Sequence, residues 1–285
     1  MLLLLGHGAH NRAMSHQLAF IGAGNMAEAI ARGVLRAKLF RVDQMLASDP
    51  QPQRRELFER QLGIRAVDSI SEAADDARAI VVAVKPQQAA AVLDKLGLAA
   101  SQDALVLSVM AGISTTFIER TMGGGAARKW RIIRAMPNTP MLVGAGMVAM
   151  ARGRHASALD FAAARMLMES AAKVIEVSED KLDAVTAVSG SGPAYFFLLV
   201  EQMIRAGVEL GLTPDEARTL AVTTAQGAGA MLAGSAESPD ELRRKVTSPG
   251  GTTQAAMQLL EQRGVPQAII DAVKRAAARS KELGQ

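Results

Sequence analysis

The sequence predicts an α/β protein, with an N-terminal Rossmann-type doubly wound sheet followed by an all-helical C-terminal domain. Three observations lead to this prediction. A glycine-rich turn follows the first apolar strand, further apolar strands alternate with amphipathic helices up to residue 177, and helical periodicity fills the rest. A chain of 285 residues has room for two domains. We predict a dinucleotide-binding domain at 14–177 and a helical domain at 178–285.

Composition excludes several functions. The chain has no cysteine, so thiolate nucleophiles, disulfides and cysteine metal sites are absent. Its net charge is +4, with a pI near 9.6, but the basic residues are dispersed and aromatic residues make up only 3%. Nucleic-acid binding normally needs clustered basic charge, so none is expected. No metal site is expected either.

The N-terminal residues precede the first predicted element. Four leucines at 2–5 are too few for a signal-peptide core, and no basic segment comes before them. Met14 offers an alternative start, and we expect residues 1–13 to be a disordered extension. No run of about 20 apolar residues is evident, so we expect a cytoplasmic protein without a membrane partner.

The first strand, at 18–21, leads directly into Gly22-Ala23-Gly24-Asn25-Met26-Ala27 and then into an Ala-rich helix. This is the Gly-x-Gly-x-x-Gly/Ala pattern in its required strand–turn–helix context. The first glycine permits a tight turn, and the second lets a pyrophosphate approach the backbone at a helix N-terminus. The alternative is a simple turn, but the context favours cofactor binding by Gly22, Ala23, Gly24, Asn25 and Met26.

The second strand, within 44–50, ends where a residue reading the cofactor's ribose is expected. Asp49 would accept the 2′-hydroxyl of NAD, whereas Ser48 with Arg54 and Arg55 would suit the 2′-phosphate of NADP. An ordinary Asp-Pro turn and a solvated helix face explain the same residues. The choice between the two cofactors stays open at this point.

Strand-like and helical segments then alternate. The strand-like segments are 63–67, 79–87, 104–114 and 129–140, and an acidic helical segment lies at 69–77. The domain ends with a strand-like segment at 146–150, a helix, and a short strand at 173–177. Fully apolar strands indicate a parallel sheet covered on both faces, where ligands bind beyond the carboxyl ends of the strands. Three turns fall there: Val84-Lys85-Pro86, Met110-Ala111-Gly112 and 136–140. Each is either a plain strand exit or part of a cofactor edge.

The second half is helical. The segment 193–210 is apolar almost all round and must be buried on most of its surface. The next helix has Thr213 as its N-cap and Pro214 as its first residue. About a hundred residues cannot bury such helices alone, so we expect a homodimer. The alternative is a monomer whose sheet domain covers the same faces.

The last helices enclose Ser248-Pro249-Gly250-Gly251-Thr252-Thr253. A short helix capped by Ser238 precedes this loop, and another helix follows it. The loop would present the Gly250, Gly251 and Thr252 amides at a helix N-terminus, which suits a carboxylate. Considered alone, a capped helix–helix turn is the better interpretation.

Taken together, "FIGAGNMAEAI", "AVKPQ", "SVMAGI", "RAMPNTP", "AVSGSGPAYFF" and above all "LRRKVTSPGGTTQAAMQLLE" closely resemble the pyrroline-5-carboxylate reductase family, from about residue 15 onward. The resemblance implies NAD(P)H-dependent reduction of L-1-pyrroline-5-carboxylate to L-proline, the final step of proline biosynthesis. It implies an interlocked homodimer, commonly assembled into a homodecamer. NADPH is the expected cofactor, with NADH as the alternative.

The resemblance also implies roles for particular residues. Gly251, Thr252 and Thr253 would hold the substrate, with Ser248 beside them, and Glu179 would lie near it. The Thr253 hydroxyl would bond the substrate nitrogen, so Thr253 and Ser248 are the catalytic candidates. Five strand-end residues would line the nicotinamide half of the cofactor: Val84, Lys85, Pro86, Met110 and Ala111.

The chain departs from the family pattern at three places. Ile70 stands where an Asn is often found near the adenosine ribose, Ala236 aligns with an acid, and the pair Ser48-Asp49 replaces a more hydroxyl-rich sequence. Two rival functions fit the sequence less well. A 3-hydroxyacid dehydrogenase would need a catalytic lysine on a glycine-containing helix, which the region of Lys173 and Lys181 lacks. A regulatory protein without turnover would not require the hydroxyls of Ser248 and Thr253.

Overall fold

The computed structural model describes residues 16–123 and 128–283. Contacts divide the chain into two compact units, Met1–Gly190 with Ala276–Gln285, and Ser191–Arg275. The extension expected at 1–13 lies outside the described residues. The division expected after Val177 follows the end of the sheet, whereas the contacts group residues 178–190 with the sheet unit.

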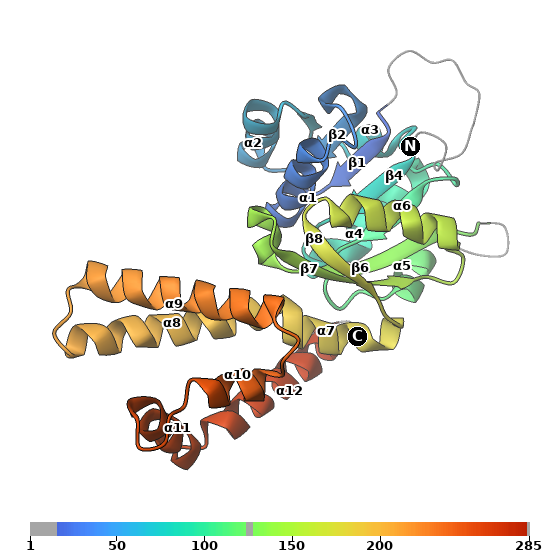
Figure 1. The fold of residues 1–285 in the computed structure, drawn as a ribbon. Coiled ribbons are helices and arrows are strands. Elements are labelled where there is room, and N and C mark those ends of the chain that lie inside the picture. The colour runs from blue at the N-terminus through green and yellow to red at the C-terminus, as the bar shows by residue number, and fades with distance from the viewer. Residues whose placement is uncertain (1–15, 124–127, 284–285) are drawn as a thin grey trace. The chain divides into compact units, whose positions relative to one another are not determined.

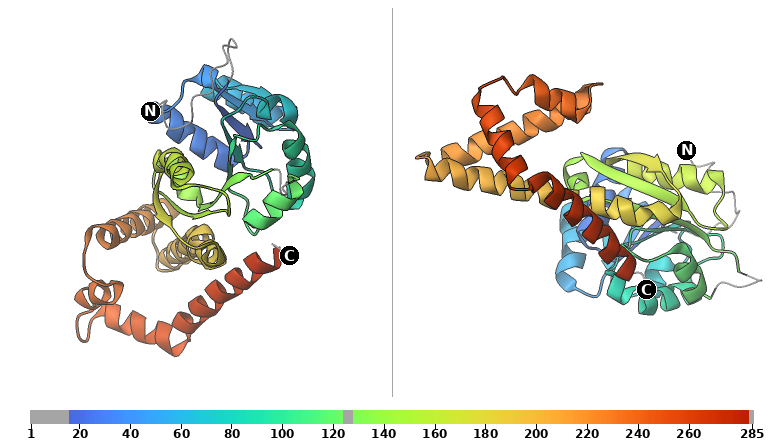
Figure 2. Two further views of the ribbon diagram at one scale, coloured as in Figure 1. Left: turned by 90° about the vertical axis from the view of Figure 1, so that its right-hand side faces the viewer. Right: turned by 90° about the horizontal axis from the view of Figure 1, so that it is seen from below.

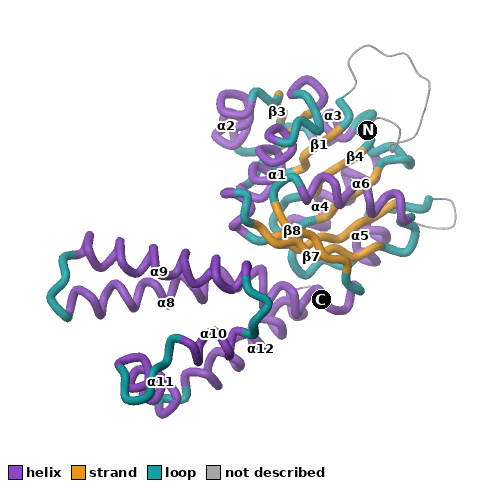
Figure 3. Tube along the Cα trace, viewed as in Figure 1, coloured by secondary structure: helices purple, strands orange, loops and turns teal. Residues whose placement is uncertain are grey.

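The first unit is built on one eight-stranded sheet with the order β3-β2-β1-β4-β5-β6-β7-β8 (Figures 1 and 3). The chain moves outward from β1 to β3 and then, beginning again beside β1, from β4 onward. This is the doubly wound topology that the sequence predicts. The strands are β1 (Leu18–Ile21), β2 (Met45–Ser48), β3 (Arg65–Val67), β4 (Ala79–Val82), β5 (Leu105–Ser108), β6 (Arg131–Pro137), β7 (Gly146–Arg152) and β8 (Ala172–Glu176).

Strands β1 to β6 are parallel, but β7 runs antiparallel to β6, which differs from the fully parallel sheet predicted from sequence. The physical reason is the length of the connection. Only residues 138–145 join the two strands, mostly as the 3-10 helix η4 (Thr139–Val143), and a parallel crossover needs about a dozen residues or more. Strand β8 then pairs parallel to β7.

Helices cover both faces of the sheet (Figure 2). Because successive side chains of a strand point to opposite faces, Leu18 and Phe20 join one apolar cluster and Ala19 and Ile21 the other. The first cluster includes α1 (Asn25–Arg36), α2 (Pro52–Leu62) and α6 (Ala158–Glu169). The second includes α3 (Ile70–Ala74), α4 (Ala89–Ala99) and α5 (Thr115–Thr121). Two 3-10 turns, η2 (Val42–Gln44) and η3 (Pro86–Gln88), connect elements of this unit.

After β8 the chain folds back onto the sheet. This junction segment consists of η5 (Glu179–Lys181), α7 (Leu182–Val185) and the π-helical turn η6 (Thr186–Gly190). Leu182 is fully buried against Ala149 and Ala151 of β7. The Ser280 hydroxyl, near the chain's C-terminus, donates to Asp183 Oδ1 at 2.7 Å. These contacts explain why residues 178–190 group with the sheet.

The second unit contains helices only: α8 (Gly192–Glu209), α9 (Pro214–Gly234), α10 (Pro239–Lys245), α11 (Thr252–Gln262) and most of α12 (Val265–Leu283). The expected caps are confirmed, since Thr213 opens α9 and Ser238 opens α10, each in a capping box with a glutamate. Helices α8 and α9 pack side by side. They approach closely at Gly207, where a Cβ would lie 3.0 Å from the Cβ of Ala217.

The second unit has almost no core of its own. Within 191–275, the buried residues are Gly192, Ala217 and Ala221. The apolar side chains of α8 are exposed instead, among them Phe196, Phe197, Leu198 and Leu199. By length and composition the helical run Glu179–Glu209 could cross a membrane, which corrects the expectation that no such run exists. An exposed apolar surface of this kind marks an interaction site.

Candidate functional site

The glycine-rich turn has the geometry that a dinucleotide requires. Gly22 adopts φ +92°, and a Cβ at this position would lie 2.8 Å from the carbonyl oxygen of Ala83. Only glycine fits, because both the left-handed backbone and the neighbouring strand exclude a side chain. Helix α1 begins immediately afterwards with Gly24 as N-cap, and in the described chain no side chain caps it. Its first amides are therefore available to a phosphate.

Asp49 holds this turn in place. Its Oδ2 accepts the backbone N–H of Ala23 at 2.9 Å, and its Oδ1 accepts that of Gln51 at 2.9 Å. Both carboxylate oxygens are thus engaged by the protein, although each retains a second acceptor position. Asp49 has a structural role at the cofactor edge in addition to the ribose contact predicted for it.

Two arginines follow Asp49, and the structure distinguishes them. Arg54 donates Nε to the Ala23 carbonyl at 2.6 Å and forms an ion pair with Glu28 at 3.0 Å. Arg55 donates instead to the carbonyls of Asp49 and Pro50, at 2.8 and 3.0 Å. Arg54 shares that acid with Arg32, which pairs with Glu28 at 2.9 Å, whereas the partners found for Arg55 in the described residues are carbonyl oxygens.

Ser48 is not placed as the phosphate-binding prediction requires. It is the last residue of β2 and is only 2% exposed, while its carbonyl accepts the N–H of Gly22. The side chain is therefore nearly buried, and its contact with a phosphate stays a prediction. Among the residues predicted to read a 2′-phosphate, Arg55 is the one whose partners in the described chain are carbonyl oxygens only.

The strand-end residues gather at one edge, because β4, β5 and β6 are adjacent and parallel. Val84, Lys85 and Pro86 follow β4, and Lys85 is exposed. Met110 and Ala111 follow β5, but Met110 is 1% exposed and its side chain belongs to the core. Only the backbone of Met110 is available to a cofactor. Contact of these five residues with nicotinamide stays a prediction.

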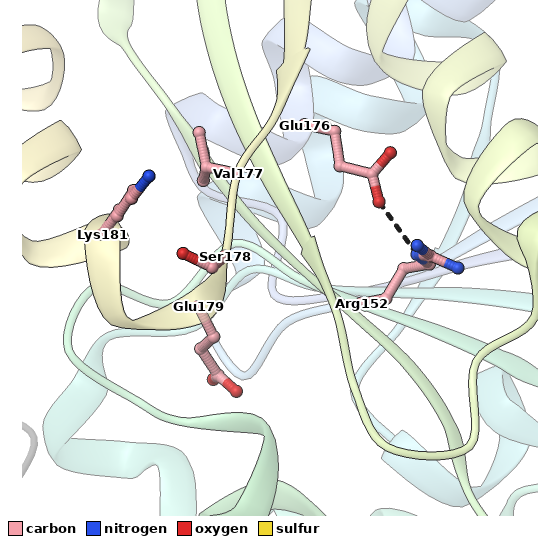
Figure 4. Close-up of a pocket in the computed structure, with 6 residues that line it drawn as sticks. All are labelled: Arg152, Glu176, Val177, Ser178, Glu179 and Lys181. Atoms are coloured by element: carbon pink, nitrogen blue, oxygen red, sulfur yellow. Dashed lines mark hydrogen bonds and ion pairs between the residues drawn. The ribbon is translucent and has the colours of Figure 1, made fainter.

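Glu179 lies at the start of the junction segment, among the residues lining a small pocket (Figure 4). One carboxylate oxygen accepts the backbone N–H of Thr115 at 2.6 Å, and the other accepts the Thr115 hydroxyl at 2.5 Å. Arg134, only 6% exposed, pairs with Glu179 at 3.4 Å. These bonds fix the start of α5, so Glu179 has a structural role, and its contact with substrate stays a prediction.

Thr115 and Arg134 are not among the residues predicted from sequence. For Arg134 a signal existed, because it is a lone charged residue in the middle of the otherwise apolar run 132–137. A charge that is buried in a sheet normally needs a partner of opposite charge. The partner could not be identified from sequence, since Glu179 lies 45 positions away along the chain.

The Ser248–Thr253 loop lies in the second unit, between α10 and α11. Gly250 adopts φ +74°, a conformation that favours glycine. Its N–H donates to the Gln254 side chain at 2.6 Å, and the N–H of Gly251 donates to the Ser248 carbonyl at 3.0 Å. These two amides are already used, which corrects the expectation that they face a ligand.

The start of α11 provides other donors. Among the described residues no side chain caps this helix, whereas α9 and α10 each have a full capping box. The amides of Thr252 and Thr253 occupy the first turn, where an α-helix leaves N–H groups without intrahelical partners. Thr253 is half-buried and Ser248 is exposed. The loop can therefore offer amides and hydroxyls to a small anion.

Two family models match the chain. The model described as pyrroline-5-carboxylate reductase dimerisation covers residues 179–283, and the model described as NADP oxidoreductase, coenzyme F420-dependent, covers 17–112. The first begins close to the predicted start of the helical domain at 178. The second contains the glycine-rich turn, Asp49 and the ends of β4 and β5.

Curated proteins and solved structures agree with these models over nearly the whole chain. The pyrroline-5-carboxylate reductase of Synechocystis is 40% identical, with 95% of this chain and all of that protein covered, and that of Pseudomonas aeruginosa is 39% identical, with 94% and 97% covered. Among solved structures, the Coxiella burnetii enzyme matches with TM-score 0.83 at 35% identity, covering 95% of this chain and 99% of that one. The Plasmodium falciparum enzyme, with NADP bound, matches with TM-score 0.85 at 28% identity and the same coverage. This chain belongs to the pyrroline-5-carboxylate reductase family.

Proposed function

We propose that this protein reduces L-1-pyrroline-5-carboxylate to L-proline with a hydride from NAD(P)H, as the last step of proline biosynthesis. The observation that carries the proposal is the pairing, in one chain, of a dinucleotide-binding sheet edge with the uncapped start of α11. The first suits a pyrophosphate, and the second suits a small carboxylate. The family membership supports the same pairing.

The reaction needs positioning more than chemical activation. A protonated cyclic imine is already electrophilic at C5, so hydride addition there turns the C=N bond into a C–N bond and leaves an amine. The chain has to hold C5 against the nicotinamide that supplies the hydride. In this proposal the Thr252 and Thr253 amides hold the carboxylate, with Gly251 and Ser248 beside it. The Thr253 hydroxyl bonds the ring nitrogen.

An unperturbed hydroxyl is a poor acid, so Thr253 acts by positioning the nitrogen rather than by donating its proton. Glu179 does not serve as the acid in this proposal, because Thr115 and Arg134 engage its carboxylate. The proton on the imine nitrogen is present before hydride arrives, since the protonated ring is the electrophile.

NADPH is the proposed cofactor, with NADH as a working alternative. The glycine-rich turn and the N-terminus of α1 would hold the pyrophosphate. Arg55, whose partners in the described chain are carbonyl oxygens, supplies positive charge beside Asp49. A 2′-phosphate would form an ion pair there in addition to a hydrogen bond, whereas a 2′-hydroxyl would form at most the hydrogen bond.

We also propose that two copies of the chain bury the exposed apolar surface of α8, and that the protein is a cytoplasmic homodimer, with a decamer as the higher assembly. The support is the dimerisation model covering 179–283 and the near absence of a core within 191–275. A second copy accounts for the apolar run Glu179–Glu209 better than a lipid bilayer does. Charged side chains on α8, including Glu201 and Arg205, would be costly in lipid.

The enzyme assay is direct. Purified protein is mixed with pyrroline-5-carboxylate and either NADPH or NADH, and cofactor oxidation is followed by absorbance. Oxidation that depends on the imine supports the proposal, and a larger kcat/KM for NADPH supports the cofactor assignment. If neither cofactor is oxidised, the proposed enzyme activity is wrong.

A further inference from the structure

Glu28, in the first turn of α1, is a carboxylate held between two arginines of the sheet unit. Its side chain is 14% exposed. Its Oε2 accepts a hydrogen bond from a terminal nitrogen of Arg54 at 3.0 Å, and its Oε1 accepts one from Nε of Arg32 at 3.0 Å. Because Arg54 belongs to α2, this carboxylate ties the helix that follows the glycine-rich turn to the next helix of the unit.

The bond to Glu28 fixes the direction in which Arg54 points. Arg54 also donates Nε to the Ala23 carbonyl at 2.6 Å, so its guanidinium is held at two points. A guanidinium is planar and presents its N–H groups in a rigid fork, so an anchored terminal nitrogen also aims Nε. Without Glu28 the long side chain would recover much of its rotamer freedom. Glu28 therefore keeps Arg54 on the Ala23 carbonyl.

The Ala23 carbonyl shares one planar peptide with the N–H of Gly24, and the two groups point in opposite directions. When Arg54 fixes the carbonyl, it also fixes the direction of that N–H. Gly24 is the N-cap of α1, at the helix end proposed to hold the pyrophosphate. The space beside it is open, because a Cβ on Gly24 would meet no described atom within 4 Å. Glu28 thus acts, through Arg54, on the backbone of the proposed pyrophosphate site.

The charge of Glu28 should by itself oppose cofactor binding. A carboxylate in the first turn interacts favourably with the helix N-terminus and repels a phosphate that approaches the same end. The two arginines offset this charge and leave one net positive charge on the group of three side chains. Charge alone therefore predicts that removing the carboxylate tightens cofactor binding, whereas the positioning of Arg54 predicts that it weakens binding.

We propose that Glu28 is a positioning residue for the cofactor. It holds Arg54 on the Ala23 carbonyl, and Arg54 in turn holds the glycine-rich turn in the conformation that receives the pyrophosphate. Glu28 itself touches no cofactor atom. The inference rests on the cofactor assignment within the proposed function, and all of its residues lie in the sheet unit.

The test measures the dissociation constants of NADH and NADPH by isothermal titration calorimetry, without substrate. Glu28→Ala removes both acceptors, and Glu28→Gln keeps the size of the side chain but leaves a single acceptor oxygen for two arginines. We expect the Kd of both cofactors to rise about threefold or more in Glu28→Ala, and less in Glu28→Gln. The two cofactors should be affected alike, because they share the pyrophosphate.

The double variant Glu28→Ala with Arg54→Ala should bind no more weakly than Arg54→Ala alone, because Glu28 acts through Arg54. In steady-state kinetics, the KM for each cofactor should rise while kcat at saturation stays within about twofold of wild type. A general loss of folded protein would not produce this division. The matched control is Glu56→Ala, which removes an exposed ion pair with Arg60 on α2 and should leave both Kd values unchanged.

Unchanged or tighter binding of both cofactors in Glu28→Ala would overturn the inference, and so would an equal weakening in Glu56→Ala. Additive losses in the double variant would show that Glu28 does not act through Arg54. A wild-type protein that binds NADPH but does not oxidise it with the imine would contradict the proposed reaction instead, and the Kd values would still decide the role of Glu28. A wild-type protein that binds neither cofactor would overturn both.

Discussion

Ala23 donates its backbone N–H to Oδ2 of Asp49 at 2.9 Å, so the carboxylate expected to read the ribose also holds the glycine-rich turn. The same turn is held on its other side, where Arg54 donates to the Ala23 carbonyl at 2.6 Å. The end of β2 and the start of α2 therefore shape the pyrophosphate site before any cofactor arrives. Such preorganisation lowers the cost of binding.

Asp49→Ala is expected to weaken the binding of both NADH and NADPH. The variant leaves the nearly buried Ala23 N–H without its acceptor, a loss of about 1–3 kcal/mol that distorts the turn shared by NADH and NADPH. The KM for each cofactor should rise, as measured by steady-state kinetics. If Asp49 only read the ribose, the KM for NADH would rise while that for NADPH stayed level or fell. Asp43→Ala, which removes an exposed partner of Arg41, is the control.

Arg55→Ala is expected to affect activity with NADPH but not activity with NADH. Loss of a charge-assisted hydrogen bond to the 2′-phosphate should cost about 1.5–3 kcal/mol, so kcat/KM for NADPH should fall by at least tenfold. The value for NADH should hardly change. Arg54→Ala is the matched comparison. It should weaken the binding of both NADH and NADPH, because Arg54 supports the glycine-rich turn. Equal losses for both cofactors in Arg55→Ala would show that Arg55 has a structural role only.

Thr253→Ala is expected to lower kcat/KM for pyrroline-5-carboxylate. The loss of transition-state stabilisation should be about 1–3 kcal/mol, the cost of one hydrogen bond to a charged group. The KM for NADPH should not change. Thr247→Ala, just before the loop, is the control. The Thr247 hydroxyl donates to the carbonyl of Arg243 in α10 and so is already bonded within the protein. Wild-type kinetics in Thr253→Ala would limit Thr253 to a backbone role at the start of α11.

Phe197→Asp is expected to disrupt the oligomer. Phe197 is 67% exposed in the single chain, and burying a carboxylate there in an apolar interface would be strongly unfavourable. Sedimentation velocity should show the wild type as a dimer or larger and the variant shifted toward monomer. Leu98→Asp, on an 83% exposed site of the sheet unit, should leave the assembly intact. A wild-type monomer at micromolar concentration would contradict the proposed dimer.

The capping box of α10 makes a pH-dependent contribution to stability. Hydrogen bonds from the backbone and then the side chain of Ser238 lower the pKa of the exposed Glu241 carboxyl. A pKa that is lower in the folded state means that the contribution is present above the unfolded pKa, near 4.3, and is lost as pH falls through the folded value. The melting temperature of Glu241→Gln should therefore lie below that of wild type at pH 7 and approach it near pH 3. A constant difference over that range would contradict this origin.

Much of the fold follows from local sequence. Apolar runs predict the positions of β1, β4 and β5, and Ser238 with Pro239 predicts the start of α10. These features could be predicted because strand and helix periodicity, caps and glycine turns depend on neighbouring residues. The direction of β7 and the π-helical turn at 186–190 depend on connection length and on contacts with distant elements, and were not predicted.

The candidate site divides in the same way. Its residue types were evident from sequence: the glycine-rich turn, Asp49 with two arginines, and the Ser248–Thr253 loop. Their individual roles were not, because burial and partner choice are set by residues far apart in the chain. Ser48 proved buried, Glu179 proved bound to Thr115, and the Gly250 amide proved to be used by Gln254.

The sequence by itself determined the doubly wound fold class, the cofactor-binding turn and the family, because each rests on short patterns that few other structures satisfy. Only the tertiary structure decided which side chains of those patterns remain available. Arg54 pairs with Glu28, whereas the partners of Arg55 among the described residues are carbonyl oxygens, and Asn138 reaches Ser189 across 51 positions. Hydrogen bonds and ion pairs form between whichever groups packing brings within about 3 Å, and packing depends on the whole chain.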